Sequence, residues 1–321
     1  MRAGITRTRG LALVIVLFIL VIMTISVAWL SEEILISLRR TENNRDSQQA
    51  WQMLVGSEAW ALSVLARDSL ESETDHLGEA WNNLGQGVAI EHGSISTAVE
   101  DLQGRLNLNN LLVEAEEGTQ QAGNQPRPRI WTEAFRRLLL SLKLDPNLSD
   151  AVLDWLDPDQ NVRGTAGAED ADYLGLTPPY RAANRAFSDV SELLWVKGFD
   201  NKTVKMLTPY VTALPATDVR ININTASSGL LRILAGDLLS EDSSEQLQSS
   251  STGENGLSVE EFLQNDMMAG EQEVAAPLID NKSSYFMIRS TTKFGRASMK
   301  INSLVERKDG LVTVIKRSPV F

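Results

Sequence analysis

The longest feature in the hydrophobic pattern is an apolar run near the N-terminus. Residues 11–30 contain no charged side chain. Further along, small or apolar residues recur every three or four positions, which indicates a helix with one buried face. Because the first proline is Pro126, we expect one unbroken helix from about residue 11 to about residue 68. The positions on the buried face are Ala50, Leu54, Ser57, Ala61, Val64 and Arg67.

Alternating apolar and polar residues predict strands in two separate places. Residues 93–111 alternate in part and favour one or two strands. After about residue 284, three alternating stretches are separated by Gly295-Arg296 and Asp309-Gly310, which predicts three antiparallel strands. Residues 221–227 read as a short strand or an extended turn leading into a helix.

The region between these strands has mainly helical patterns. We expect exposed loop or linker at 116–129, and a mobile low-complexity segment at 240–256. The predicted helices span 130–144 with Thr132 as cap, 149–156 with Ser149 or Asp150 as cap, 188–199 with a cap between Ser188 and Ser191 and an end at Gly198, 201–211, 228–239 and 257–266.

This order predicts an α+β fold. A long helix would pack on a small antiparallel sheet, and a large helical domain would be inserted into the sheet domain. Two independent domains in series explain the order less well, because the strands near residue 100 would then form a lone hairpin, which is marginal in stability.

Composition limits the chemistry. The chain of 321 residues has a net charge of −12, which argues against nucleic acid as a partner. It has no cysteine and only His76 and His92, so an ordinary zinc site and thiol catalysis are not expected. Any bound metal would have to prefer oxygen ligands.

The N-terminal apolar run predicts a membrane anchor. Twenty helical residues at ~1.5 Å each span ~30 Å, the thickness of a bilayer core. Basic residues precede the run and Glu32 and Glu33 follow it, so the N-terminus should stay in the cytoplasm and the rest should lie outside it. A buried core helix is a poorer interpretation, and a cleavable secretory signal would need a small-residue cleavage site that this run lacks.

The residues before the run resemble the leader of the type IV prepilin class. The basic leader ends in Gly10, and the resemblance implies cleavage by a membrane peptidase between Gly10 and Leu11, with the helix kept. Most members carry Glu at the fifth mature position, where this chain has Ile15. A carboxylate in hydrocarbon needs a partner, so Ile15 suits a subunit at the end of a filament; drift of the position is the alternative.

An acidic loop, residues 154–173, holds the candidate metal ligands. Asp157, Asp159 and Asn161 alternate as the first oxygen ligands of an EF-hand do, although Val162 and Ala168 stand where an EF-hand has Gly and Glu. A second acidic arm lies beyond the bend at Gly164–Gly167. Flexible oxygen ligands favour calcium over magnesium, while the alternative is a solvated acidic loop. The predicted ligands are Asp154, Asp157, Asp159, Asn161, Glu169, Asp170 and Asp172.

An enzyme is the competing class. Asp157 and Glu169 could act as acid and base, as glycosidase carboxylates do. No Ser-His-Asp set and no phosphate-binding glycine loop supports this interpretation, so we expect a structural protein without catalytic residues.

Several short motifs occur in an order that resembles one family. "GRLNLNNL", "DWLDPDQ", "GAEDADY", "YRAANR", "SDVSELL" and "NINTAS" follow the leader in the order found in the K-type minor pseudopilins of the type II secretion system. The motifs span roughly residues 10–300, although residues 236–283 match no pattern of the family. A minor pilin of a type IV pilus or of a DNA-uptake filament remains the alternative.

The resemblance implies a fold, a place and partners. A pilin-like domain (31–111 and 284–321) would follow a leader (1–10) and a transmembrane helix (11–30), with an inserted helical domain at 112–283. The chain would be anchored in the bacterial inner membrane with its soluble part in the periplasm, at the tip of the pseudopilus. Its partners would be I- and J-type minor pseudopilins, the major pseudopilin and prepilin peptidase, and the acidic loop would hold structural calcium.

Overall fold

The computed structural model describes residues 8–85, 87–117, 129–234, 256–265 and 270–320, together with residues 245, 248, 249 and 268. The loop expected at 116–129 and the low-complexity segment at 240–256 lie almost wholly outside the described residues, as does most of the basic leader. The expectations for these segments stay predictions.

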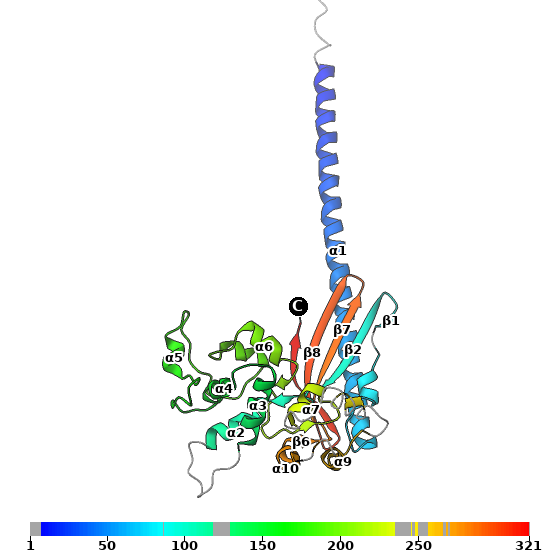
Figure 1. Ribbon diagram of the computed structural model, residues 1–321. Helices are drawn as coiled ribbons and strands as arrows, with labels where there is room; N and C mark the ends of the chain where they lie inside the picture. Colours follow the sequence, from blue (N-terminus) through cyan, green and yellow to red (C-terminus); the bar gives the residue numbers. More distant parts are fainter. Residues whose placement is uncertain are drawn as a thin grey trace, which may run out of the picture.

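One helix, α1 (Thr8–Glu71), dominates the N-terminal part of the molecule. Its first half extends away from everything else (Figure 1), and its apolar side chains between Leu11 and Leu38 are exposed. Its second half packs on the sheet through buried residues such as Leu54 and Ala61. The predicted single helix is therefore confirmed, and it is long and apolar enough at its start to cross a membrane.

A five-stranded antiparallel sheet lies against the second half of α1. Its strand order is β1-β2-β7-β8-β9. The predicted hairpin turn at Asp309-Gly310 is present, since both residues have the positive φ of a type I′ turn. The strands after residue 284 are thus confirmed, while β1 was not predicted. The bounds are β1 (Val88–Ile90), β2 (Gly93–Asp101), β7 (Tyr285–Phe294), β8 (Ala297–Lys308) and β9 (Leu311–Pro319).

The core of this part lies between α1 and the sheet. On β7, Phe286 and Ile288 alternate with exposed or half-buried residues and point toward the helix side. The edge of Trp81, in the short 3₁₀ helix η1 (Ala80–Asn83), meets the Phe286 ring with centroids 5.5 Å apart. The remaining core residues are Ala61, Val64, Leu65, Leu84, Val99 and Val305.

The chain leaves the sheet after β2 and returns to it at β7. Asp101 at the end of β2 pairs with Phe286 of β7, so everything between them is an excursion from neighbouring strands. That excursion builds a second core beside the sheet (Figure 1). The second core already includes Leu106, Leu108 and Leu111, which lie before the predicted boundary at residue 112.

The excursion is mainly helical, with two short parallel strand pairs, β3–β4 and β5–β6. Its elements are β3 (Leu106–Asn107), α2 (Asn110–Glu117), α3 (Ile130–Ser141), α4 (Leu148–Leu156), α5 (Asp170–Leu174), η2 (Val190–Trp195), α6 (Asn201–Leu207), β4 (Val211–Thr212), β5 (Ile221–Asn222), α7 (Ser228–Leu234), α9 (Val259–Gln264), α10 (Gln272–Ala275), η4 (Ala276–Leu278) and β6 (Ile279–Asp280).

The caps predicted for the helices at 130–144 and 149–156, which are α3 and α4 in the structure, are wrong. Thr132 lies inside α3, where its hydroxyl donates to the Glu114 carboxylate (2.6 Å). That carboxylate also accepts the backbone N–H groups of Trp131 and Thr132, so a side chain from α2 satisfies the start of α3. Ser149 and Asp150 lie inside α4 and accept from Arg136 at 2.8 Å each.

The helix expected at 188–199 is the shorter 3₁₀ helix η2. Its cap is Asp189, whose carboxylate accepts the Ser191 backbone N–H at 2.8 Å. The predicted end at Gly198 is wrong, because η2 ends at Trp195; Gly198, with φ of +88°, lies in the turn that follows.

Two of the sequence motifs have a structural role, one within the inserted part and one at its junction with the sheet. The Asn109 side chain exchanges hydrogen bonds with the Phe187 backbone (2.9 and 2.7 Å). The Asn222 amide donates to Asp101 (3.1 Å) and Ser283 (2.8 Å), which lie at the ends of the excursion. Both asparagines are buried. Polar groups without water need such partners, which explains why the motifs are rich in asparagine.

Candidate functional site

The acidic loop runs from the end of α4 to the start of α5. The loop is anchored by Trp155, whose ring meets Tyr173 edge-on at 5.3 Å. It also needs glycine at one close approach: a Cβ on Gly167 would come within 2.3 Å of an Asp154 oxygen. The backbone therefore passes directly over the Asp154 carboxylate, and the loop folds around its own acidic groups.

Four of the predicted ligands are brought together. Asp154 and Asp157 are fully buried, and Glu169 is only 2% exposed. Asp157, Asp159 and Glu169 each offer a carboxylate oxygen, and these oxygens lie within 4.8 Å of one another. Asp154 adjoins them through Arg163, with which both it and Asp157 form ion pairs.

The buried oxygens are only partly satisfied. Arg163 donates from its backbone N–H to Asp154 (3.1 Å) and from Nε to Asp157 (3.0 Å). Among the described residues, Asp154 Oδ1, Asp157 Oδ1 and both Glu169 carboxylate oxygens have no hydrogen-bond partner. Buried carboxylates in this state are costly unless they are neutralised. Because one guanidinium faces four acids, a further positive group would offset the remaining negative charge.

The crowding changes the acidities. Burial, followed by the charges of Asp154, Asp157, Asp159 and Asp170, raises the pKa of Glu169 to about 8. Burial also raises the pKa of Asp154 to about 6, with the Asp157 charge adding to it. The pKa of Asp157 is raised by burial as well. Near neutral pH the cluster must therefore hold a proton or attract a cation.

The other three predicted ligands have different surroundings. Asp170 accepts the Ala182 backbone N–H (3.1 Å) and faces Arg181. Asp172 accepts from Lys197 Nζ (2.9 Å), which lowers the pKa of its carboxyl. Asn161 is exposed, and only its backbone N–H contributes, by donating to Asp159 at 2.7 Å. A ligand role for these three residues stays a prediction that their contacts do not favour.

The predicted processing residues lie in the first turns of α1. A Cβ on Gly10 would meet nothing within 4 Å, and Leu11 is 65% exposed. The fold itself gives no reason for glycine at position 10, although glycine inside a helix costs about 0.5–1 kcal/mol relative to alanine. A reason outside the fold, such as recognition by a peptidase, is consistent with this position.

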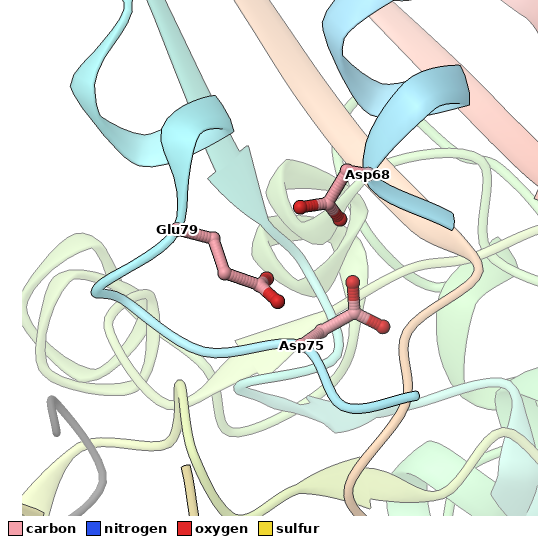
Figure 2. Close-up of side chains that lie close together, drawn as sticks. All are labelled: Asp68, Asp75 and Glu79. Atoms are coloured by element: carbon pink, nitrogen blue, oxygen red, sulfur yellow. The ribbon is translucent and has the colours of Figure 1, made fainter. Parts of the chain in front are cut away.

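A second carboxylate cluster, which was not predicted from the sequence, is formed by Asp68, Asp75 and Glu79 (Figure 2). These acids lie at and just after the predicted end of the long helix, near residue 68. The signal that could have raised suspicion is His76 among them, since it is one of only two histidines. No spacing rule links Asp68 and Asp75 to Arg307 on β8, with which both form ion pairs.

Comparison with known proteins gives consistent results. Residues 104–216 match the family model described as "Type II secretion system (T2SS), protein K". The chain is 32% identical to the type II secretion system protein K of Aeromonas hydrophila, covering 97% of both chains. It is also 32% identical to that of Pseudomonas aeruginosa, covering 96% of this chain and 92% of the relative.

A solved structure has the same fold. It is the crystal structure of the GspK-GspI-GspJ complex from the type 2 secretion system of enterotoxigenic Escherichia coli. The matched chain superposes with a TM-score of 0.75 at 26% identity, over 88% of this chain and 99% of the other. The likeness extends beyond the family-model match, which begins after β2 and ends before β5.

Proposed function

We propose that this chain caps the tip of the pseudopilus. The chain belongs to the type II secretion system protein K family and is thus a minor pseudopilin of that system. The observation that carries the proposal is the family membership joined to the shape in Figure 1: a pilin-like helix and sheet with a second core built out from one end of the sheet. Such bulk beside the sheet hinders the stacking of another subunit above it.

The exposed half of α1 supports a membrane anchor. Its apolar side chains between Leu11 and Leu38 have no partner within the described chain, and a surface of this kind is stable only in lipid or among other helices. We place the anchor in the inner membrane and the sheet and inserted helices in the periplasm. In an assembled filament the same surface would contact neighbouring α1 helices.

The proposed partners rest on the exposed surface of α1 and on the solved complex. In that complex GspK occurs together with GspI and GspJ, so we propose I- and J-type minor pseudopilins as neighbours, with the major pseudopilin below them. Ile15 carries no carboxylate to pair with the N-terminal amine of a subunit above, which fits a terminal position. Catalysis has no part in this role.

Filament stoichiometry tests the tip proposal. In purified pseudopili this subunit should occur at far less than the amount of the major pseudopilin, and an antibody against the inserted helices should label one end only. Labelling along the whole length, or equal amounts of the two subunits, would refute the proposal. Replacing Ile15 by Glu should change neither result.

Processing is tested separately. We propose that prepilin peptidase cuts between Gly10 and Leu11. Gly10→Val adds a branched side chain at the cleavage site where the fold has open space, so the protein should fold but remain unprocessed. Mass spectrometry of the parent should give a mature chain that begins at Leu11; a different first residue contradicts the assignment.

The acidic loop fits a structural calcium ion. The donors are oxygen atoms only, three carboxylates converge with Asp154 beside them, and several buried oxygens of these acids lack partners among the described residues. Asp154, Asp157, Asp159 and Glu169 would hold the ion, and Arg163 would remain as a second positive group. A bound divalent cation would neutralise the buried charge and stiffen a loop that no disulfide can brace, because the chain has no cysteine.

A further inference from the structure

The second carboxylate cluster lies where α1 ends. Asp68 is in the last turn of α1, and Asp75 and Glu79 follow in the segment leading to η1. The three side chains are almost fully buried, with exposures of 8%, 3% and 9%. They turn toward one another (Figure 2), and each offers an oxygen within 4.8 Å of the others.

Most of the oxygens in this cluster have partners. Arg307 on β8 donates from Nη1 to Asp68 (3.0 Å) and from Nη2 to Asp75. The other Asp75 oxygen accepts the Ser283 backbone N–H at 2.7 Å. Glu79 Oε2 accepts the Trp81 indole N–H at 2.7 Å. These contacts come from three separate segments, so the positions of the carboxylates are fixed by distant parts of the fold.

One buried oxygen is left over, on a side chain that points toward the other two carboxylates (Figure 2). Among the described residues, Glu79 Oε1 has no hydrogen-bond partner, although the side chain is 8% exposed. The nearest basic group is His76 Nε2 at 3.7 Å, beyond hydrogen-bond distance. His76 Nδ1 accepts the Gly78 N–H at 3.2 Å, so the ring cannot turn its other nitrogen closer without losing that bond.

The charges do not balance. Three carboxylates and one guanidinium meet here, so these four groups, when ionised, carry a net charge of about −2 in a buried place. A divalent cation would bring the sum to zero. The spacing also fits, because oxygens up to 4.8 Å apart can surround a point about 2.4–2.8 Å from each, close to the usual Ca²⁺–O distance of about 2.3–2.6 Å.

We propose that Asp68, Asp75 and Glu79 form a second divalent-cation site, separate from the acidic loop and selective for calcium. The all-carboxylate donor set and the fixed Arg307 favour a cation that accepts irregular oxygen coordination, which is the property of calcium rather than magnesium. Burial together with the neighbouring Glu79 and Asp75 charges raises the pKa of Asp68 to about 7, in keeping with a shortage of positive charge.

The position gives the ion a mechanical role. Asp68 belongs to α1, Arg307 to β8, and Ser283 to the segment through which the chain returns from the inserted helices to the sheet. Calcium at this point ties the end of the long helix to the junction between the two cores. The inserted part is then held in a fixed orientation on the pilin-like part. This inference does not depend on where in the filament the subunit stands.

Calcium counting on the full chain in detergent tests the site. Glu79→Gln keeps the shape and an acceptor oxygen for Trp81 but removes the charge. Glu73→Gln, at an exposed position in the same segment, makes the same charge change and serves as the control. Bound calcium per chain, measured by equilibrium dialysis, should fall by one in Glu79→Gln and stay unchanged in Glu73→Gln. The difference should persist in a Glu169→Gln background, where the acidic loop is weakened.

Terbium luminescence provides a second measurement that leaves the ligands intact. The Trp81 indole lies against Glu79, so a lanthanide in this site is excited through that ring. In the Glu169→Gln protein, tryptophan-sensitised terbium emission should be displaced by calcium, lost with Trp81→Phe and kept with Trp155→Phe. Equal calcium counts in Glu79→Gln and Glu73→Gln overturn the proposal. If Glu79→Gln fails to fold, terbium emission that is absent or insensitive to Trp81→Phe overturns it.

Discussion

The acidic loop and the cluster at the end of α1 answer the same electrostatic problem in different ways. In each, one guanidinium contacts two buried carboxylates and a glutamate keeps unpartnered oxygens among the described residues. In the loop the arginine is Arg163, six residues from Asp157. In the other cluster it is Arg307, on a strand more than two hundred residues away.

This difference in sequence distance predicts a difference in what holds each cluster. The loop closes on itself, and within the described chain both oxygens of Glu169 lack partners. The cluster at the end of α1 receives backbone and indole donors from several elements, and only one Glu79 oxygen is left. We therefore expect the loop to depend mainly on its ion, and the other cluster to depend mainly on Arg307.

The largest expected effect is the loss of Arg307. Arg307→Met leaves Asp68 and Asp75 buried without their partner, which should lower the free energy of unfolding by about 3–5 kcal/mol. Arg163→Met is the matched change in the acidic loop. With calcium present it should cost clearly less, because we expect the loop to depend mainly on its ion and the other cluster mainly on Arg307. Urea unfolding of both variants in calcium and in chelator measures this; equal losses for the two in calcium would contradict the comparison.

The next effect is that of calcium on the parent chain. If the ion binds only the folded loop, stability rises by RT ln(1 + [L]/Kd), about 2.7 kcal/mol at a hundred times Kd. Asp159→Ala should abolish most of the gain that arises in the loop. If the loop were simply solvated, removing one of its like charges would leave the chelated protein unchanged or slightly more stable.

Thermal melts of parent and Asp159→Ala, each with calcium and with chelator, separate these outcomes. Glu79→Gln in the same experiment reports the second site. The part of the calcium-dependent gain in stability that Glu79→Gln removes should be independent of the part that Asp159→Ala removes when the two sites do not interact. The same melting temperature for the parent in both buffers would rule out calcium binding at both clusters.

The sequence predicted the features that depend on neighbouring residues. The α1 helix, the strands β7 to β9 and the acidic loop are all visible as local periodicity or composition. The hairpin turn at Asp309-Gly310 follows from two residues that accept positive φ. The approach of Asp157, Asp159 and Glu169 was predicted because one short loop carries them all.

What failed was decided by contacts between distant segments. Thr132 looked like a cap, but the Glu114 carboxylate from another helix takes that role. The ligand roles predicted for Asp170 and Asp172 stay predictions, and the contacts with Ala182 and Lys197, which also come from distant segments, do not favour them. The cluster around Asp68 depends on Arg307, which no local pattern could indicate. Sequence spacing alone gives no information on such partners.

A smaller effect concerns pH in the absence of calcium. Folded Glu169 keeps its proton up to about pH 8, whereas an ordinary glutamate releases it near 4.5. Between these values the folded state binds more protons than the unfolded state, so the stability of the chelated protein should fall as the pH rises through this window. Calcium, which binds the ionised carboxylate, should reverse the slope.

Glu169→Gln isolates this contribution from those of the other buried acids. In chelator, the difference in melting temperature between parent and variant should grow from pH 5 to pH 8, with the parent less stable at the higher pH. A difference that is constant across the range would show that Glu169 has an ordinary pKa and is not crowded by Asp154 and Asp157.

The smallest expected effect distinguishes the acids that hold the ion from those that only neighbour it. Asp172 is partly exposed and pairs with Lys197 across the start of α5. Removing an ion pair near the surface costs about 0–1 kcal/mol, so Asp172→Asn should lower the melting temperature only slightly.

Because Lys197 occupies the carboxylate of Asp172, the calcium-dependent rise in the melting temperature of Asp172→Asn should equal that of the parent. Asp157→Asn, a change of the same chemistry at a buried position of the same loop, should remove that rise. If Asp172→Asn removes it too, the second acidic arm binds the ion directly, and Lys197 must move away when calcium enters the loop.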